Sequence, residues 1–325
     1  MSLAAFIREI GRGQSGARDL SQGEAQQLYG AMLDGKVPDL ELGAIVIALR
    51  VKTETVDEMV GFLAAARQRL PALRPPRGHL RPVVIPTYNG ARRSANLTPL
   101  VALLLQRFGV PVLVHGLADD YGRVTSEQIF SALGLPPSSS LAQAQLAIDE
   151  HGLAYLPLPL LSAGLDRQLA LRSRLGLRNS AHSLVKMLDP FAGEGLLLAA
   201  ATHPDYITSM RAVLNSLGAH ALLLRGSEGE PFANPKRRPM IEHLHDGTSD
   251  VLFEAEHDSL RNLPQLPENC DAAATVAWMR RVLAGEVSLP LPIANQLACC
   301  LYACGRARDF NQAKALVAVE SLARA

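Results

Sequence analysis

Apolar residues recur every three or four positions through the first seventy residues of the chain, a spacing typical of amphipathic helices. Ser21 stands three residues before Glu24, which is the spacing of a capping box at the start of a helix. Several prolines then follow within the segment 71–76 and break the pattern. The sequence therefore predicts an all-helical domain over residues 1–73.

After this break, short runs of consecutive apolar residues alternate with longer stretches of helical periodicity. The apolar runs are 83–85, 110–115, 154–156, 195–200 and 219–224, and the helical stretches are 100–108, 126–133, 141–150, 204–217, 272–283, 291–305 and 310–322. Strands that are apolar on both faces and separated by helices are typical of a parallel sheet covered on both sides. We predict an α/β fold in which a small helical N-terminal lobe, joined by helices within 165–190, accompanies a large domain over 74–325. In that domain a mostly parallel central sheet is flanked by helices.

Positive and negative charges are segregated along the chain, although its net charge is only +1. The 325 residues are 48% hydrophobic and 19% charged, a composition that excludes an intrinsically disordered protein. No Asp or Glu occurs between residues 59 and 118, where there are eight arginines, and a second acid-free stretch covers 167–188. Such segregation predicts a basic face that binds an anionic partner, with ordinary solvated helix faces as the alternative.

Three of the four cysteines fall in one apolar helical run, which predicts buried thiols rather than a disulfide framework or a zinc site. No charged leader precedes a long apolar segment at the start of the sequence, so we expect no signal peptide. The apolar runs at 100–105 and 196–201 are too short to cross a bilayer. We therefore expect a cytoplasmic protein with no membrane partner.

The segment after the first predicted strand has the position of a ligand-binding loop but an unusual composition. In α/β proteins ligands bind beyond the carboxyl ends of the strands, and a phosphate cradle there requires glycines that let backbone N–H groups face the anion. Here Pro86 lacks an N–H group and Tyr88 is bulky, while Arg92 and Arg93 follow closely. This pattern indicates a phosphate-binding turn that has lost glycines and carries its positive charge on side chains.

Several spacings along the chain match the motifs of one family of transferases. Pro86-Thr-Tyr-Asn-Gly90, five residues and Asn96-Leu-Thr-Pro99 have the spacing of a phosphate loop that reads Gly-Thr-Gly-Gly-Asp, five residues and Asn-Ile-Ser-Thr. His115-Gly116 lies where that family has Lys-His-Gly-Asn, and Arg123, eight residues later, lies where a basic residue helps to hold phosphate. Leu175-Gly-Leu-Arg178-Asn179 resembles a Leu-Gly-X-Arg-Thr motif whose arginine faces an aromatic acid. The chain thus resembles the anthranilate phosphoribosyltransferases over nearly its full length, which implies a helical domain joined to an α/β domain.

The resemblance implies a former phosphate and substrate site beyond the first strands. Its residues are Thr87, Tyr88, Asn89, Gly90, Asn96, Thr98, His115, Gly116 and Arg178. The family's two magnesium-binding acids have one counterpart at most, because Glu230 is followed by Pro231, which cannot bind a metal ion. We therefore expect no catalytic residue, no metal site beyond the vestigial candidate Glu230, and no cofactor. Magnesium is expected only if the chain is a transferase.

The stretches 86–93, 178–182 and 230–235 resemble more narrowly the YbiB-type proteins, a divergent branch of this glycosyltransferase family 3 fold. That resemblance implies a homodimer, formed through the helical lobe, that binds DNA or RNA. Cationic side chains around the old site would hold backbone phosphates without reading the base sequence. They are Arg92, Arg93, Arg123, Arg178, Lys186, Lys236, Arg237 and Arg238.

Other interpretations of the same residues stay open. The chain is alternatively a phosphoribosyltransferase that uses phosphoribosyl pyrophosphate with an altered acceptor, or a scaffold whose dimer is its function. Tyr88 either stacks on an unpaired base or packs inside its loop. Asn96 and Thr98 either contact the ligand or cap the helix that begins near Pro99. The stripe that either joins two subunits or belongs to the core is Leu40, Ile45, Val46 and Leu49.

Overall fold

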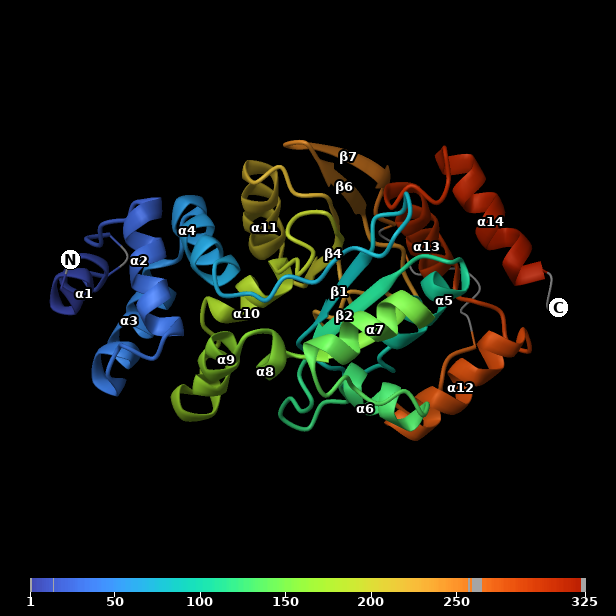
Figure 1. Cartoon of the computed structure of the whole chain (residues 1–325), viewed down its shortest axis with the longest axis horizontal. Helices are drawn as coiled ribbons and strands as arrows, with labels where there is room; N and C mark the ends of the chain where they lie inside the picture. The colour runs from blue at the N-terminus through green and yellow to red at the C-terminus, as the bar shows by residue number, and fades with distance from the viewer. Residues whose placement is uncertain (1, 14, 257, 259–264, 323–325) are drawn as a thin grey trace.

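The computed structural model describes residues 2–13, 15–256, 258 and 265–322. Helices form its N-terminal part, which Figure 1 shows in blue at one end of the molecule. They are α1 (Leu3–Ile10), α2 (Gln22–Leu33), α3 (Asp39–Lys52) and α4 (Val56–Arg67). Ser21 and Glu24 form the expected capping box at the start of α2.

Helices α2 and α4 pack closely because a glycine lies between them. A Cβ atom on Gly61 would come within 2.4 Å of the carbonyl oxygen of Gln22. Nearby, the buried carboxylate of Glu58 accepts hydrogen bonds from the Leu20 N–H group (2.9 Å) and from the Lys52 ammonium group (2.7 Å). Close backbone packing and a buried ion pair therefore hold this helical lobe together.

A later segment of the chain returns to the helical lobe. It comprises α8 (Leu158–Leu161), α9 (Ala163–Leu175), α10 (Ala181–Leu184) and the 3₁₀ turn η1 (Val185–Met187). Arg167 donates to the carbonyl oxygen of Leu33 (2.7 Å), and the side chain of Gln168 donates to that of Met32 (3.3 Å). Helix α9 is thus bonded directly to the end of α2, although Arg167 and Leu33 lie 134 positions apart in sequence.

The centre of the molecule is a seven-stranded sheet in the order β3-β2-β1-β4-β5-β6-β7. The strands are β1 (Val83–Thr87), β2 (Val112–Gly116), β3 (Leu153–Pro157), β4 (Leu196–Ala201), β5 (Ala221–Arg225), β6 (Ile241–His245) and β7 (Thr248–Phe253). The first five run parallel, which confirms the predicted α/β fold with a mostly parallel sheet, and β6 and β7 extend it antiparallel. The sequence did not reveal these last two strands, because β7 is largely exposed and neither is a continuous apolar run.

Helices cover both faces of the sheet, as the alternating pattern predicted. Val84 packs into one core and its neighbour Ile85 into the other, because successive side chains of a strand point to opposite faces. The first core contains the helical lobe, α7 (Leu141–His151) and α11 (Pro204–Ser216). The second contains α5 (Thr98–Arg107), α6 (Ser126–Ala132), α12 (Ala272–Ala284), α13 (Leu291–Ala303) and α14 (Phe310–Leu322). In Figure 1, α12 and α14 lie at the end opposite the helical lobe.

The cysteines of the apolar run are buried free thiols, as expected. Cys299 and Cys300 lie in α13 and Cys304 directly follows it. Burial raises the pKa of Cys304 to about 11, so this thiol stays protonated near neutral pH. Within the part of the chain that the structure describes, none of the helices has the length and apolar character needed to span a membrane.

Candidate functional site

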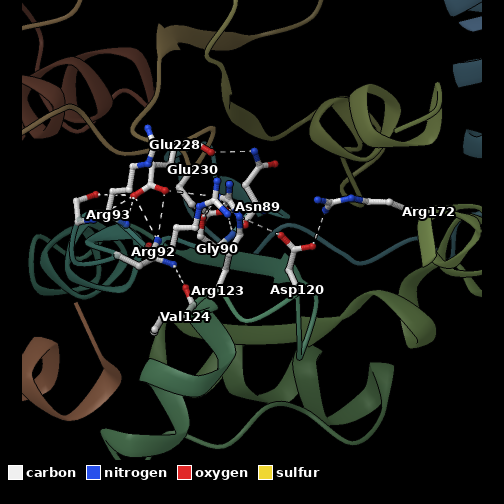
Figure 2. Close-up of polar contacts among 12 residues, drawn as sticks. Asn89, Gly90, Arg92, Arg93, Asp120, Arg123, Val124, Arg172, Glu228 and Glu230 are labelled. Carbon is white, nitrogen blue, oxygen red and sulfur yellow. Dashed lines mark hydrogen bonds and ion pairs between the residues drawn. The ribbon is translucent and has the colours of Figure 1, made fainter. Parts of the chain in front are cut away.

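Loops that follow β1, β2 and β5 meet at the carboxyl edge of the parallel strands, where ligands bind in α/β folds. Strands β1 and β2 lie so close here that a Cβ atom on Gly116 would be 2.1 Å from the carbonyl oxygen of Thr87. We call residues 88–97, which connect β1 to α5, the phosphate loop. Residues 226–230, directly after β5, contact it along its length, as Figure 2 shows.

The carboxylate of Glu230 fills the first half of the phosphate loop and is fully buried. One of its oxygens accepts hydrogen bonds from the N–H groups of Asn89 (2.7 Å) and Gly90 (2.9 Å). The other accepts the hydroxyl groups of Thr98 (3.1 Å) and Thr87. Hydrogen bonds to an ionised group are roughly twice as strong as neutral ones. The N–H groups at this end of the loop are therefore already paired with an acid of the same chain.

The carboxylate of Glu228 fills the second half of the loop. It accepts the N–H groups of three consecutive residues, Arg93 (2.9 Å), Ser94 (3.1 Å) and Arg92 (3.3 Å). It also accepts the hydroxyl group of Ser94 (3.1 Å), and the guanidinium group of Arg123 lies 3.6 Å away. Figure 2 shows Glu228 and Glu230 side by side against the loop. Together the two acids occupy donors at both ends of a loop that resembles a phosphate-binding turn.

Residues of the segment after β2 fix the phosphate loop in this position. Arg123 donates to the carbonyl oxygens of Gly90 (3.1 Å) and Asn89 (3.4 Å). Ala91 and Val124 exchange two backbone hydrogen bonds of 3.0 and 2.8 Å. Arg123, which the sequence predicted as a phosphate contact, thus has its guanidinium group directed at the loop itself.

Lys186 and Gly229 fix the segment 226–230 against the loop. The buried ammonium group of Lys186 donates to the carbonyl oxygens of Gly229 (2.9 Å) and Ala200 (3.2 Å). Burial lowers the pKa of Lys186 to about 8. Gly229 has a φ of 93°, and a Cβ atom there would lie 2.0 Å from the side-chain nitrogen of Asn89. Any other residue at position 229 would therefore be strained in its backbone and would require the side chain of Asn89 to move.

A pocket of about 970 Å³ opens beside the phosphate loop. Its lining includes Arg93 from the loop and the basic cluster 236–238, so two regions that the sequence could not place relative to each other share one cavity. Four of its cations are exposed and form no ion pair with any residue that the structure describes. They are Arg93, Arg225, Lys236 and Arg237.

The rest of the pocket combines apolar side chains with paired charges. Ile207 and Met240 are half-buried apolar residues of its wall. Arg238 lines it too, but its guanidinium group is 3.0 Å from the carboxylate of Glu256. Glu228 also belongs to the lining, so its carboxylate is accessible from the pocket. The cavity therefore suits an anion attached to an apolar or aromatic group.

Comparisons with known proteins agree with this architecture. Residues 4–70 match the helical bundle domain of a glycosyl transferase family. The uncharacterised protein YbiB of Escherichia coli is 44% identical over 318 residues, which cover 98% of this chain and 99% of that protein. The anthranilate phosphoribosyltransferase of Methylocella silvestris is 26% identical over 313 residues, which cover 95% of this chain and 88% of that enzyme. The chain belongs to the anthranilate phosphoribosyltransferase-like family.

A solved structure shows the same fold for this family. The anthranilate phosphoribosyltransferase of Thermus thermophilus matches with a TM-score of 0.78 at 23% identity, over 98% of this chain and 94% of that one. This structure confirms the predicted fold, and the sequence relatives confirm the resemblance to the anthranilate phosphoribosyltransferase-like family that the loop and strand-end motifs predicted.

The family resemblance implies magnesium near Glu230, but the residues around this carboxylate do not fit a cation. Its oxygens accept hydrogen bonds from two N–H groups and two hydroxyl groups, which place partial positive charge where a metal ion would have to bind. Mg²⁺ requires several oxygen ligands in near-octahedral geometry. Among the described residues, no group of three His, Cys, Asp or Glu side chains is placed to hold a metal ion. In this family member Glu230 is an internal ligand of the phosphate loop.

Tyr88 and His115, two of the predicted site residues, belong to the protein interior. The Tyr88 side chain is 4% exposed, and its hydroxyl group lies 2.6 Å from Nδ1 of the fully buried His115. Burial lowers the pKa of His115 to about 3, so its ring is neutral near pH 7. The interpretation of Tyr88 as a stacking platform for an unpaired base is therefore wrong, because the ring cannot be reached from solvent.

The predicted cations divide into an exposed and an inner set. The inner set comprises Arg123, Arg178 and Lys186. Of these, Arg123 and Arg178 lie near Asp120, whose carboxylate is 3.9 Å from Arg123 and 2.9 Å from Arg172, a cation that was not predicted for the site. Burial, together with the charge of Arg172, lowers the pKa of Arg178. Lys186 is buried and its ammonium group donates to two backbone carbonyl oxygens, which corrects its prediction as a phosphate contact. The exposed set is Arg92, Arg93, Lys236 and Arg237, and Arg238 is half-buried and paired with Glu256.

Asn96 and Thr98 serve the loop rather than a ligand. The side-chain oxygen of Asn96 accepts the N–H group of Thr98 (3.1 Å) at the start of α5, and its amide donates to Ser126 (3.2 Å). The Thr98 hydroxyl group donates a hydrogen bond to the carboxylate of Glu230. Sequence reasoning missed Glu228 and Arg225 altogether. Glu228 could have been found from its position beside Gly229, in the segment where the family has its magnesium-binding acids.

Proposed function

We propose that this protein binds the phosphate backbone of nucleic acids, DNA or RNA, without reading the base sequence. One observation carries the proposal. The backbone donors of the phosphate loop are paired with the carboxylates of Glu228 and Glu230, whereas the exposed cations next to the loop form no ion pair among the residues that the structure describes. The N–H groups that would bind a small diphosphate are already hydrogen-bonded to these two carboxylates. An extended polyanion meets guanidinium and ammonium groups that are available.

Physical chemistry supports this choice of ligand. Guanidinium groups bind phosphate oxygens bidentately and need no glycine-rich cradle. Each phosphate contact releases condensed counterions, so the affinity for a polyanion depends steeply on salt. The apolar wall of the pocket, with Ile207 and Met240, offers a surface for the sugar or base attached to a bound phosphate.

The test is the binding of a fluorescent oligonucleotide of random sequence, measured by anisotropy at two ionic strengths. The variant Arg93→Glu with Lys236→Glu should bind every sequence more weakly and should reduce the salt slope by roughly 0.7–0.9 for each lost phosphate contact. Arg280→Glu with Arg281→Glu, two exposed residues of α12 outside the pocket, is the charge-matched control. Equal losses in both variants, or binding that does not respond to salt, would contradict the proposal.

The comparisons favour a second candidate, a phosphoribosyltransferase with an altered acceptor. Its support is the similarity of nearly the whole chain to enzymes named anthranilate phosphoribosyltransferase. Asn96, His115 and Arg178 also stand at the positions that match that family's motifs. Calorimetric titration with magnesium and phosphoribosyl pyrophosphate tests it. Magnesium-dependent heat of binding in the wild-type protein would favour the transferase over the first proposal, and the absence of such heat would count against the transferase.

We also propose that the protein is a homodimer joined through its helical lobe and that it is located in the cytoplasm. The stripe expected to form the contact lies mostly inside: Ile45, Val46 and Leu49 are buried, which corrects their interpretation as an interface. Leu40 and Val51 of α3 are 83% and 53% exposed and remain available for contact. Light scattering of Leu40→Asp beside the wild-type protein tests the dimer. Free cysteines are typical of a reducing compartment and support the location.

A further inference from the structure

The hairpin of β6 and β7 carries a pair of histidines on the face of the sheet that α13 covers. His243 and His245 lie two positions apart on β6, so their side chains share one face, and their ring centroids are 4.6 Å apart. The ring of Tyr302, in α13, makes a T-shaped contact with His243 at a centroid distance of 6.1 Å. Nε2 of His243 is shielded from solvent and has no hydrogen-bond partner among the residues that the structure describes. A positively charged ring would therefore carry a buried N–H group without an acceptor.

The charges around His243 do not compensate for a positive charge on its ring. Those that act on it are His245 on β6, Asp250 on β7, and His220 and Arg81, which directly precede β5 and β1. The carboxylate of Asp250 is already 2.8 Å from Nε2 of His245, and Asp246 in the turn lies 3.7 Å from Nδ1 of the same ring. Burial, together with the charge of His245, lowers the pKa of His243 from its ordinary value of 6.5 to about 4.

Strand β7 is the element that can respond to such a charge. It is the last strand in the sheet order, and its side chains are mostly exposed, so few buried contacts hold it against β6. The turn between the two strands is Asp246-Gly247, with a positive φ at both positions (49° and 77°), as in tight hairpins. Beyond the other end of β7, Ala255 and Glu256 line the pocket, and the Glu256 N–H group donates to the carbonyl oxygen of Arg238 (3.0 Å). Strand β7 thus connects the histidine pair to the wall of the pocket.

We propose that the β6–β7 hairpin is an acid-sensitive switch, in which protonation of His243 detaches β7 from β6 and loosens the pocket wall at Ala255 and Glu256. Detachment brings the ring of His243 into water, where its positive charge is hydrated. Because the pKa of this ring is lowered in the closed hairpin, the open hairpin binds the proton more tightly. Opening therefore becomes easier as the pH falls from about 6.5 towards about 4. The switch does not depend on which anion occupies the pocket.

The experiment is amide hydrogen exchange of the full chain at about pH 7.5 and about pH 5, corrected for the intrinsic pH dependence of exchange. At the lower pH, the protection of the amides in residues 248–256 should fall by more than about ten-fold, and that of the β1 amides should fall less. His243→Gln removes the titrating ring and should reduce this change to less than about three-fold. His151→Gln is the matched control, because it removes an exposed histidine of α7, and it should keep the change in full.

Unchanged protection of residues 248–256 in the wild-type protein, or an equal fall in His243→Gln, would overturn the proposal. An equal fall in β1 would do the same, because the whole domain would then be unfolding. If His243→Gln does not fold, an NMR titration of the wild-type protein decides instead. The ring of His243 must then titrate over the same pH range in which residues 248–256 lose protection, and a ring that titrates while these amides stay protected refutes the switch.

Discussion

Replacing Glu230 by alanine should destabilise the protein more than most single substitutions. The change removes the acceptor of the Asn89 and Gly90 N–H groups and of the Thr98 hydroxyl group, all near a fully buried position. The Thr87 hydroxyl group keeps a partner, because it lies 2.7 Å from that of Ser126. Three donors are therefore left without an acceptor.

The magnitude follows from this count. A buried donor without a partner costs about 1–3 kcal/mol, so the free energy of unfolding should fall by at least about 3 kcal/mol. That is a large share of the roughly 5–15 kcal/mol by which proteins are stable. The segment 226–230 also loses its attachment to the phosphate loop, which adds to the effect.

Equilibrium unfolding in urea, followed by tryptophan fluorescence, measures this loss. The chain has one tryptophan, Trp278, which is 4% exposed in α12 and reports on the α/β domain. The midpoint should fall while the slope of the transition stays the same. Glu256→Ala, which breaks a partly exposed ion pair, is the control and should cost less than about 1 kcal/mol. A Glu230→Ala protein as stable as this control would refute the role assigned to the buried carboxylate.

Further predictions concern the groups around the loop. The pKa of Lys186 is about 8 in the folded protein, which is below its value in the unfolded chain. The free energy of unfolding of the wild-type protein, relative to that of Lys186→Met, should therefore rise between about pH 8 and 10.5. A difference between the two urea midpoints that stays constant over this range contradicts the prediction. Gly229→Ala should lower the melting temperature more than Gly218→Ala, because Gly218 also has a positive φ (58°) but has open space for a Cβ atom. Equal losses in the two variants would contradict the close packing of residue 229 against the phosphate loop. Tyr88→Phe should cost about 1 kcal/mol in urea unfolding, because it removes the hydroxyl partner of His115. Tyr88→Leu, which removes the aromatic ring, should leave the oligonucleotide affinity of the folded protein unchanged in anisotropy; weaker binding by the folded variant would restore the stacking interpretation.

The parallel part of the sheet was predictable because burial on both faces demands continuous apolar strands. The run at 219–224 thus predicted β5 to within a few residues. Strand β7 escaped detection since its register depends on pairing with β6, and its own side chains are mostly exposed. Exposed strands have no hydrophobic signature in a single sequence.

The position of the site could be predicted from the sequence, but the contacts within it could not. The loop after β1 and the acid Glu230 were recognised from spacing, since both are local patterns. The pairing of Glu228 with Arg93 joins residues 135 positions apart, and no local pattern encodes where such a segment closes. For the same reason Tyr88, an aromatic residue in a loop, was compatible with either exposure or burial until His115 was placed beside it.

The return of α9 to the helical lobe has a consequence for how the molecule can move and be divided. The chain passes between lobe and sheet after α4, again before α9, and again after η1. The three chain crossings and the shared core tie the lobe to the sheet. A fragment ending near residue 73 would lack Leu165 and Leu169, which pack in the shared core, and would expose the surface they cover. The N-terminal helices therefore do not form an independent folding unit, and exchanging them between relatives requires exchanging α9 as well.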